Sequence, residues 1–337
     1  MQSAKPTFSV VITTEHEEES LLATLTAVAG QDVTPGAVEI LITDYAPEPR
    51  EDTVRRLAGN LRAPAHYYRL PGARPFAARN VGIREAGGDI VLFTDDDCVP
   101  PPGWLRAYQR AFENPEVGVA GGPDKAPSSV RPFLRALEYV LTSFAGAAGL
   151  RGSGSLSART FYPRSWNMAV SRKALERVGL FDESLPGAQD YDLVLRVREA
   201  GLGVELLPDC VVSHRRDTNL PGLLLSGLRS SMGRAYIARI RPGSGRFLHA
   251  LPATGGLLYA GLLAASAFTP AAATLLAGLA SAYLVLLLMS CLHAAFVMKN
   301  PRMLALVPVA MVAQHAAHAA GFLVGSILGL LSRRRKR

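Results

Sequence analysis

The sequence predicts an α/β fold in which a mostly parallel sheet is flanked by helices and followed by C-terminal transmembrane helices. Three observations support this fold class. Short apolar runs alternate with helical segments over residues 8–93, acidic residues follow two of these runs, and the 51 residues from Leu248 to Met298 contain no Asp, Glu, Lys or Arg. Such alternation indicates parallel βαβ units, and the chargeless stretch exceeds twice the roughly 20 residues that one helix needs to cross a bilayer.

The elements of the α/β part are predicted from the period of their apolar residues. FSVVI and IVLF are typical of short buried strands, and Ser20 is a suitable N-cap for the first helix. Parallel sheets bind ligands at the carboxyl ends of their strands, so Asp44 and Asp95–Asp97 fall where a ligand would bind. In order, the predicted elements are a strand over 8–12, a helix over 20–30, a strand over 38–42, a helix over 52–61, a strand over 66–68, a helix over 75–86 and a strand over 90–93.

Charge is distributed unevenly along the chain. All 28 acidic residues precede Thr218, so residues 1–217 carry 24 Lys or Arg and a formal charge of −4, whereas the other 12 basic residues have no acidic counterpart. A nucleic-acid-binding protein would normally carry its basic face on the folded polar domain, so we expect no nucleic-acid partner. A basic region joined to apolar runs indicates a membrane surface instead.

The polar domain is expected to lie in the cytoplasm. Cys98, Cys210 and Cys291 are odd in number and far apart, which disfavours a disulfide framework and favours a reducing compartment. The N-terminal sequence MQSAKPTFSVVIT has too short an apolar stretch for a signal peptide. We therefore expect a multi-pass protein of the cell (plasma) membrane whose residues 1–217 form a cytoplasmic domain.

The C-terminal part is predicted to contain an interfacial helix and a transmembrane region. Residues 218–246 mix apolar residues with arginines, as in an amphipathic helix that lies on anionic lipid. Within the transmembrane region, 247–337, Thr269-Pro270 is a natural turn between spans over 248–268 and 271–298. Basic residues flank this hairpin on both sides, and the positive-inside rule places both flanks in the cytoplasm.

A third apolar run, over 303–331, is open to two interpretations. A single crossing would place the basic tail, Arg333–Arg337, outside the cell, which the positive-inside rule disfavours. A re-entrant or in-plane helix pair, broken near Pro308 or over 314–318, would keep the tail inside. Three glycines spaced four residues apart also predict close packing against another helix. These glycines are Gly321, Gly325 and Gly329.

Three adjacent carboxylates, Asp95, Asp96 and Asp97, follow the strand predicted over 90–93. Their mutual repulsion is costly unless a cation offsets it, although a solvated acidic turn is the alternative. Mg²⁺ and Mn²⁺ prefer oxygen ligands, and Asp95 and Asp97 can point the same way while Asp96 points elsewhere. The location at a strand end, before PPPGW, favours a site for Mn²⁺ or Mg²⁺.

Several motifs, in their order and spacing, resemble the family 2 glycosyltransferases with the GT-A fold over residues 6–240. The motifs are SVVITTEHEE, EILITD, ARNVG (Ala78–Gly82), FTDDDCVPPPGWL (Phe93–Leu105), WNMAVSR (Trp166–Arg172), GLFDE (Gly179–Glu183) and QDYDLVLRV (Gln189–Val197). The resemblance implies a GT-A (Rossmann-like) sheet that carries a nucleotide-sugar and a divalent metal. It also implies that the sugar passes to an acceptor with inversion at the anomeric carbon.

The resemblance also assigns residues to the donor and to the metal. Residues at the ends of the first two strands would frame the base and ribose, and Asp44 would accept a hydrogen bond from the base. Arg79 would approach the pyrophosphate, where an always-charged guanidinium offsets the leaving group. The donor-binding set is Thr13, Glu15, Asp44, Arg79, Asp95 and Asp96, and the metal set is Asp95, Asp97 and His214.

The acceptor side requires a base, because the attacking hydroxyl must lose its proton. The sequence QDYD opens a predicted helix and resembles the family's Glu-Asp motif, whose aspartate is the proposed base; Asp190 occupies that position. Gln189 replaces the usual glutamate, which puts in doubt any role that needs a second negative charge. The alternative for Asp190 is an acid favoured at a helix N-terminus. By the same resemblance, Trp166 is a candidate for the acceptor wall, and His214 supplies an imidazole suited to Mn²⁺.

The sequence therefore predicts a metal-dependent inverting glycosyltransferase that moves a sugar from a nucleotide-sugar to a membrane-associated acceptor. The acceptor is lipid-linked or a saccharide, and membrane lipids are further partners. A phosphate acceptor would depend less on Asp190, since its oxygen is already ionised. Three alternatives are a nucleotidyltransferase, a non-catalytic scaffold and a processive polysaccharide synthase, the last disfavoured because no Gln-x-x-Arg-Trp motif is present.

Overall fold

The computed structural model describes residues 8–15, 18–32, 37–48, 51–52, 54, 63–127, 131–147, 161–216, 218–245 and 247–335. The chain divides into two compact units, which are described separately. The sheet unit comprises Met1–Pro127, Leu156–Glu183 and Gln189–Arg216. The helical unit comprises Ser128–Ser155, Ser184–Ala188 and Asp217–Arg337.

The sheet unit is built on a seven-stranded sheet with the order β3-β2-β1-β4-β8-β6-β9. Among the described strands of this sheet, only β8 pairs antiparallel with its neighbours, so the predicted mostly parallel sheet is confirmed. The strands are β1 (Phe8–Thr14), β2 (Val38–Asp44), β3 (Ala65–Arg69), β4 (Ile90–Asp95), β6 (Val117–Gly121), β8 (Met168–Ser171) and β9 (Gly203–Leu206).

The first four strands are longer than their apolar runs. β1, β2 and β4 each continue for two further polar residues, because the backbone ladder pairs Thr13 with Asp95 and Thr14 with Asp44. The predicted helices over 20–30 and 75–86 are found as α1 (Glu18–Ala29) and α3 (Pro75–Glu85). The predicted N-cap was wrong, because α1 begins two residues before Ser20, which lies inside the helix. The predicted helix over 52–61 lies largely outside the described residues.

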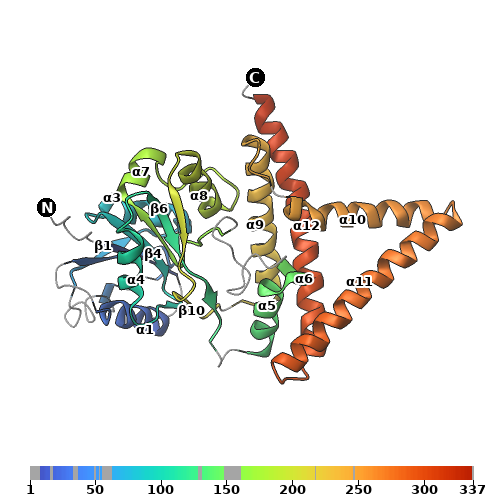
Figure 1. Ribbon diagram of the computed structural model, residues 1–337, viewed down its shortest axis with the longest axis horizontal. Coiled ribbons are helices and arrows are strands. Elements are labelled where there is room, and N and C mark those ends of the chain that lie inside the picture. The colour runs from blue at the N-terminus through green and yellow to red at the C-terminus, as the bar shows by residue number, and fades with distance from the viewer. Residues whose placement is uncertain are drawn as a thin grey trace. The chain divides into compact units, whose positions relative to one another are not determined.

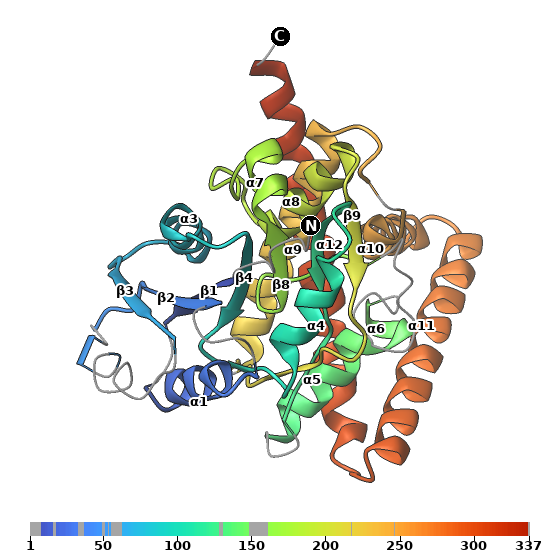
Figure 2. The ribbon, with the colours of Figure 1, turned by 60° about the vertical axis from the view of Figure 1, so that its left-hand side comes forward.

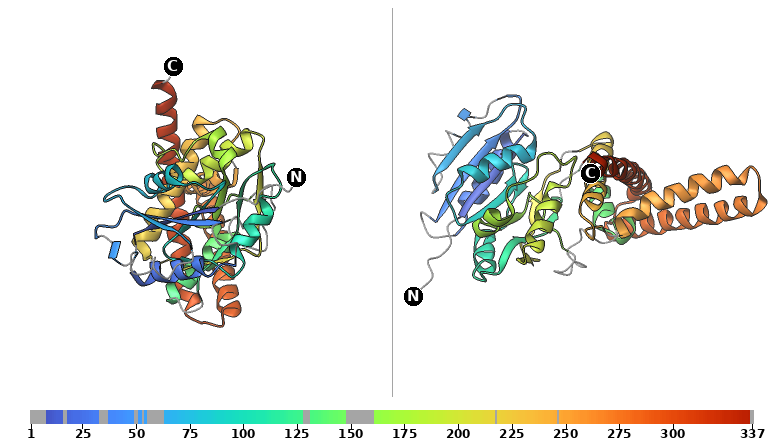
Figure 3. Two further views of the ribbon diagram at one scale, coloured as in Figure 1. Left: turned by 90° about the vertical axis from the view of Figure 1, so that its left-hand side faces the viewer. Right: turned by 90° about the horizontal axis from the view of Figure 1, so that it is seen from above.

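Two apolar cores cover the two faces of the sheet. On one face, α1 and α4 (Trp104–Ala111) contribute large buried side chains, among them Leu21, Leu25 and Trp104. On the other face, the sheet packs against α3, α7 (Arg172–Val178) and α8 (Gln189–Glu199). Figure 2 shows α1 and α3 on opposite sides of β1 and β2, and the same layering is visible in Figure 3, left.

A second, smaller sheet brings distant segments of the chain to the carboxyl end of β4. It has the order β5-β10-β7, formed by β5 (Cys98–Val99), β10 (Val212–His214) and β7 (Asp124–Lys125). His214 stands opposite Cys98 in the antiparallel pair of β10 and β5. The acidic turn after β4 and a histidine more than a hundred residues later in the sequence therefore share one small sheet.

The helical unit contains four long helices and the shorter α5 (Pro132–Thr142) and α6 (Phe144–Ala147) among its described residues. The predicted interfacial segment forms α9 (Leu220–Ile240), which runs beside α12 (Met303–Arg335) in Figure 1. A Cβ atom at Gly321 or Gly325 would lie well inside 3.0 Å of the α9 backbone, at Leu228 and Met232 respectively. The predicted close packing of these glycines is confirmed, and the two helices run parallel because both numberings increase together.

The remaining long helices, α10 (Phe247–Ser266) and α11 (Pro270–Val297), follow each other through a turn and contact each other (Figure 3, right). Most of their large apolar side chains are exposed in the isolated chain. Together with α12 they are three helices long and apolar enough to cross a membrane. This finding suggests membrane association and agrees with the predicted hairpin.

The third apolar run is one continuous helix. α12 passes through Pro308 and through residues 314–318 without interruption, so the expected break of a re-entrant pair is absent from the described helix. Pro308 lies inside this helix, where it removes one i→i−4 hydrogen bond, and the helix nevertheless continues through it.

One buried asparagine holds several loops of the sheet unit together. Asn167 is fully buried, and its Oδ1 accepts hydrogen bonds of 2.9 Å from both Trp104 Nε1 and Tyr108 Oη. Its Nδ2 donates to the carbonyl oxygens of Pro123 at 2.9 Å and Cys210 at 2.7 Å. These carbonyls precede β7 and β10, so Asn167 fixes the approach of both strands to the small sheet.

Replacing this asparagine tests the importance of the network. We expect Asn167→Ala to lower the free energy of unfolding by about 3 kcal/mol, because two buried donors and two buried carbonyls each lose a hydrogen bond. Among the described residues, only the Pro123 carbonyl of the two keeps a second one, from the Val212 amide. The melting temperature of the purified protein measures the effect. Asn114→Ala is the matched control, since Asn114 is exposed and accepts a bond only within its own turn. Equal melting temperatures for the two variants would contradict the assignment.

Candidate active site

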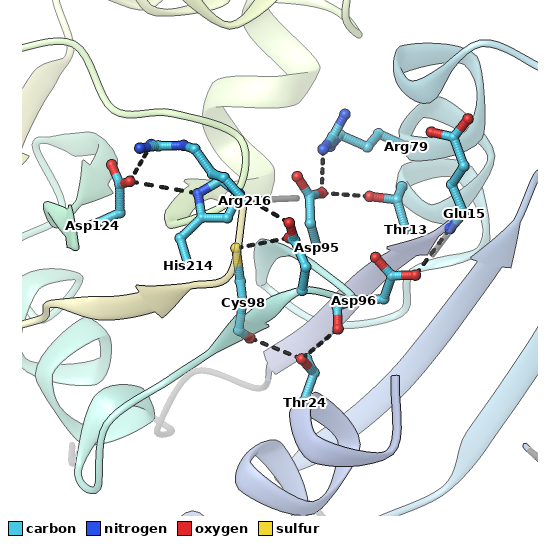
Figure 4. A network of polar contacts seen from close by, with 11 residues as sticks. Thr13, Glu15, Thr24, Arg79, Asp95, Asp96, Cys98, Asp124, His214 and Arg216 are labelled. Atoms are coloured by element: carbon cyan, nitrogen blue, oxygen red, sulfur yellow. Dashed lines mark hydrogen bonds and ion pairs between the residues drawn. The ribbon is translucent and has the colours of Figure 1, made fainter. Parts of the chain in front are cut away.

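The three carboxylates at the end of β4 contact three different sets of partners. Figure 4 shows Asp95 beside Thr13 and Arg79, and Asp96 beside Glu15. Asp95 ends β4, and its Oδ1 accepts a hydrogen bond of 2.6 Å from Thr13 Oγ1 and an ion pair from Arg79. The Arg79 guanidinium is almost entirely buried, while a fifth of the Asp95 side chain remains exposed. Arg79 Nε has no hydrogen-bond partner among the described residues. The Arg79–Asp95 pair therefore retains one hydrogen-bond donor, Arg79 Nε, and a carboxylate that a ligand can reach.

The middle carboxylate, Asp96, faces into the fold. Its Oδ2 accepts hydrogen bonds from Thr14 Oγ1 at 2.7 Å and from the Glu15 amide at 3.0 Å. In addition, Thr24 of α1 donates to the carbonyl oxygens of Asp96 and Cys98. These bonds tie the acidic turn to β1 and α1. Asp96 thus has an evident role in fixing the turn.

The third carboxylate, Asp97, lies against an imidazole. His214 Nε2 is 3.3 Å from Asp97 Oδ2, and His214 Nδ1 is 3.5 Å from Asp124 Oδ2, too long for a well-formed hydrogen bond. Asp124 also forms an ion pair with Arg216. Potential ligand atoms of Asp97, Cys98 and His214 all lie within 4.8 Å of one another. These three buried groups form a candidate metal centre.

The protonation states of these groups favour Asp97 and His214, and not Cys98, as metal ligands. Burial, followed by the charge of Asp97, raises the pKa of the Cys98 thiol, so it stays protonated and is a poor ligand. Burial and then the Arg216 charge lower the pKa of His214, but contacts with Asp124 and Asp97 outweigh them and raise it overall. An incoming divalent cation would replace that proton. Carboxylate oxygen and imidazole nitrogen together fit Mn²⁺.

At the end of β2, Asp44 is engaged by its own neighbours. It is fully buried, accepts hydrogen bonds from Tyr67 Oη and from the Ala46 amide, and lies 3.6 Å from an Arg69 nitrogen. The adjacent Tyr45 donates to Glu15 Oε2 at 2.9 Å. Burial, and then the charge of Asp95, raises the pKa of Tyr45, so its hydroxyl remains a hydrogen-bond donor.

A second cluster surrounds Trp166. Its ring lies 5.1 Å from the His214 ring, and the guanidinium carbons of Arg164 and Arg216 lie 5.9 and 5.5 Å from its centroid. Its Nε1 is buried without a hydrogen-bond partner among the residues that the structure describes. Trp166 therefore lies between two arginines: Arg216, which follows His214, and Arg164.

Arg164 leads to the candidate base. Arg164 Nη1 lies 3.3 Å from Asp190 Oδ2, and Asp190 Oδ1 accepts a hydrogen bond of 2.8 Å from the Tyr191 amide. Asp190 and Gln189 are both buried in the first turn of α8. The carboxylate is thus held at both oxygens. A guanidinium on one side and the first turn of α8 on the other therefore fix its orientation.

A family model described as glycosyl transferase family 2 matches residues 9–179, just over half of the 337-residue chain. The chain belongs to glycosyl transferase family 2. This match confirms the resemblance of the sequence motifs, and with it the interpretation of the chain as a glycosyltransferase.

Two curated relatives illustrate how far the similarity extends. A pre-mycofactocin glycosyltransferase of Mycobacterium tuberculosis is 31% identical over 147 residues, which cover 43% of this chain and 31% of the relative. Glycosyltransferase AglE of Haloferax volcanii is 24% identical over 224 residues, which cover 64% of this chain and 68% of the relative. The matched segment is thus only 31% of the length of the mycobacterial enzyme.

Among solved structures, the mannosyltransferase PcManGT from Pyrobaculum calidifontis, in complex with GDP-Man and Mn²⁺, resembles this family 2 chain with a TM-score of 0.64 at 20% identity. The superposition covers 95% of this chain and 88% of that protein. At this identity the likeness speaks for the fold, and it agrees with the predicted GT-A architecture.

The family 2 fold brings together most of the residues that the sequence singled out. Asp95, Arg79 and Thr13 form one contact group, and Asp97 and His214 form another. Asp95 lies outside the candidate metal centre found among the described residues, so its part in metal binding stays a prediction. The same holds for the donor roles of Glu15, Asp44 and Asp96 and for the acceptor roles of Trp166 and Gln189.

Four residues of the site were not anticipated from the sequence. Asp124, Arg164 and Arg216 lie in irregular segments or in very short strands, where apolar periodicity gives no signal. For Arg216, the only available signal in the sequence was its position two residues after His214. Tyr45 directly follows Asp44 at a strand end, the same signal that identified Asp44 itself.

Removing the imidazole tests the candidate metal centre. We expect His214→Ala to weaken Mn²⁺ binding by more than about 10-fold, since even the loss of an outer partner of a ligand costs that much. Isothermal titration of the purified protein with Mn²⁺ measures the affinity. His66→Ala provides the matched control, because His66 is an exposed residue of β3. Unchanged Mn²⁺ affinity in His214→Ala would rule out this imidazole as a ligand.

Proposed function

We propose that this family 2 chain is a metal-dependent, inverting glycosyltransferase that moves a sugar from a nucleoside-diphosphate sugar to a membrane-associated acceptor. The observation that carries the proposal is the Asp97–His214 pair, 3.3 Å apart at the carboxyl end of β4 and next to the turn that holds Asp95. Parallel α/β sheets bind their ligands at this end. PcManGT, which shares the fold, has been solved with GDP-Man and Mn²⁺, and this supports the same ligand classes here.

Asp97 and His214 are the residues that would hold the metal. A divalent cation bound there would supply Lewis-acid stabilisation of the departing diphosphate. Its remaining ligands would come from the donor phosphates, as is usual for Mg²⁺ and Mn²⁺ sites with few protein carboxylates. Buried carboxylates without a counter-ion are costly, so the positive charge would also relieve the repulsion within the acidic turn.

Arg79 and Asp95 are proposed to bind the donor. Arg79 is buried and pairs with Asp95, yet its Nε lacks a partner among the described residues. A phosphate oxygen would satisfy this donor and share the guanidinium charge. Tyr45 and Glu15, which are hydrogen-bonded to each other near this corner, are suited to contacts with the ribose or base.

On the acceptor side, Asp190 is proposed to accept the proton of the attacking hydroxyl. The acceptor oxygen forms a bond to the anomeric carbon while the bond from that carbon to the diphosphate oxygen breaks, so the nucleoside diphosphate leaves with the electron pair. Arg164 and the Tyr191 amide hold the two Asp190 oxygens and keep the carboxylate oriented during this transfer. Attack opposite to the leaving group inverts the configuration.

The helical unit supports an acceptor at the membrane. It contains three helices long and apolar enough to span a bilayer, and residues 218–337 contain 12 basic and no acidic side chains. Such a surface attracts anionic lipid. We therefore propose a multi-pass protein of the plasma membrane, with its sheet unit in the cytoplasm and a lipid-linked or saccharide acceptor at the bilayer surface.

Product analysis tests this proposal. Detergent-solubilised protein is incubated with lipid extract, Mn²⁺ and a panel of UDP-, GDP- and dTDP-sugars labelled in the sugar. We expect label in the organic-extractable fraction, together with release of a nucleoside diphosphate. Release of pyrophosphate would indicate a nucleotidyltransferase instead, long water-soluble polymer would indicate a processive synthase, and failure to bind any of the donors would indicate a scaffold.

Replacing the candidate base distinguishes two kinds of acceptor. We expect Asp190→Asn to lower kcat by about 10²- to 10⁴-fold for a hydroxyl acceptor, which is the usual contribution of a general base. A phosphate acceptor would lose much less, because its oxygen is already ionised. Asp209→Asn serves as the control, since Asp209 is exposed in the same unit. Full activity of Asp190→Asn with a hydroxyl acceptor would exclude this residue as the base.

A further inference from the structure

Within the helical unit, the first half of α12 packs against a helix that carries charge. Val307 of α12 and Leu137 of α5 belong to one buried apolar cluster of this unit. Helix α5 also carries Arg135 and Glu138, neither of which is fully buried. Charged side chains at such positions are costly in hydrocarbon, so α5 is suited to the surface of a bilayer and not to its core.

The second half of α12 packs against α9. Ser231 Oγ of α9 donates a hydrogen bond of 2.7 Å to the His318 carbonyl oxygen of α12. Further along both helices, Tyr236 Oη donates a hydrogen bond of 3.1 Å to Ser332 Oγ. Between these two bonds lie the glycines of α12 at which the two helix backbones touch. Neighbouring residues of α9 and of residues 318–332 must therefore share the same environment in a bilayer.

Helix α9 is too highly charged for the bilayer core. Arg229, Arg234 and Arg239 are spread over about 15 Å of helix, half of the roughly 30 Å that the hydrocarbon core measures. If α9 crossed, Arg229 would lie near the bilayer centre, because it stands at the middle of the helix. Residues 218–337 contain no acidic side chain that could pair with it there. Helix α9 is therefore excluded from the core, and residues 318–332 of α12 are excluded with it.

The rest of α12 is too short to cross a bilayer alone. Residues 303–317 measure about 22 Å as a helix, against a core of about 30 Å. By contrast, α10 and α11 contain 20 and 28 residues, which span about 30 and 42 Å. Within the helical unit, Figure 1 shows α10 running across the direction of α9 and α12. A bilayer that α10 crosses therefore has α9 and α12 lying along its surface.

We propose that α9 and α12 lie side by side on the cytoplasmic surface of the bilayer and bind anionic lipid headgroups, while only α10 and α11 cross. The inference rests on the proposed membrane location and not on the proposed catalytic residues. Arginines of α9 would meet the headgroup phosphates, and exposed apolar side chains such as Leu323 and Ile327 would enter the boundary with the acyl chains. The basic tail, Arg333–Arg337, then stays in the cytoplasm, as the positive-inside rule favours.

Cysteine labelling with a membrane-impermeant maleimide tests this topology. Full-length protein is expressed in bacteria, and labelling is compared between intact and lysed spheroplasts. We expect Phe268→Cys, in the turn between α10 and α11, to be labelled in intact spheroplasts. Lys299→Cys and Arg337→Cys should be labelled only after lysis. The wild type supplies the background, since its three cysteines are buried.

The other labelling patterns overturn the inference in different ways. Label on both Phe268→Cys and Arg337→Cys in intact spheroplasts would mean that α12 crosses the bilayer. Protection of Phe268→Cys until lysis, or label on Lys299→Cys without lysis, would also contradict the proposed membrane location. Sugar transfer by the detergent-solubilised protein is measured independently, so the proposed activity can survive each of these results.

Depth measurements check the orientation of α12 directly. Nitroxide labels are attached at Leu323→Cys in α12 and at Leu284→Cys in the middle of α11, both of which replace exposed leucines. The protein is placed in nanodiscs of phosphatidylcholine and phosphatidylglycerol, and relaxation by oxygen and by a water-soluble nickel complex gives the depth of each label. We expect Leu284→Cys near the bilayer centre and Leu323→Cys close to the headgroups. Equal depths near the centre would overturn the inference.

Removal of charge tests the lipid partner. We expect phosphatidylglycerol in the nanodiscs to raise the melting temperature of the wild type, because basic residues at the surface attract anionic headgroups. The double variant Arg229→Gln with Arg239→Gln should lose most of this rise. Arg84→Gln with Arg110→Gln makes the same change of charge on exposed arginines of the sheet unit and should keep it. No rise in the wild type, or an equal rise in both double variants, would overturn the binding of anionic headgroups by α9.

Discussion

The repulsion between three adjacent carboxylates is the constraint on which the rest of this site depends. The fold resolves it by giving each carboxylate its own partners. Asp95 meets Thr13 and Arg79, Asp96 accepts hydrogen bonds from Thr14 and from the backbone amide that follows β1, and Asp97 meets His214. Because the three directions differ, Asp96 can fix the turn while its two neighbours remain available to ligands. Strand β10 is needed to bring the imidazole to the last of them.

From this turn the contacts extend in a chain across the sheet unit. The His214 ring lies beside the Trp166 ring at a tilt, Trp166 lies under two guanidinium groups, and one of these groups pairs with Asp190. Asn167, adjacent to Trp166, holds the loops that precede β7 and β10. Donor-side and acceptor-side candidates are thus linked through one aromatic residue and its neighbours, which is the arrangement expected of a preorganised site.

The sequence was informative where regular patterns carry the structure. Apolar periodicity identified β1 to β4 but predicted none of the later strands, and the acidic triplet was recognised because it follows a buried strand. The predicted strands ended too early along the chain. Residues such as Thr13 and Asp44 are polar and were therefore left out, yet they pair in the ladder of the sheet. Arg164 and Asp124 could not be found, because tertiary folding of irregular segments brings them into place. Glycine spacing in α12 predicted close packing, but nothing in the sequence named α9 as its partner.

The measurement that addresses the central claim most directly is donor turnover at controlled free metal concentration. Wild-type protein and the double variant Asp95→Asn with Asp97→Asn are freed of metal by chelation, and sugar transfer is followed as Mn²⁺ is restored. The account predicts that the chelated wild type is inactive and recovers with Mn²⁺, whereas the double variant stays inactive at every concentration. Undiminished turnover by either the chelated wild type or the double variant would contradict it.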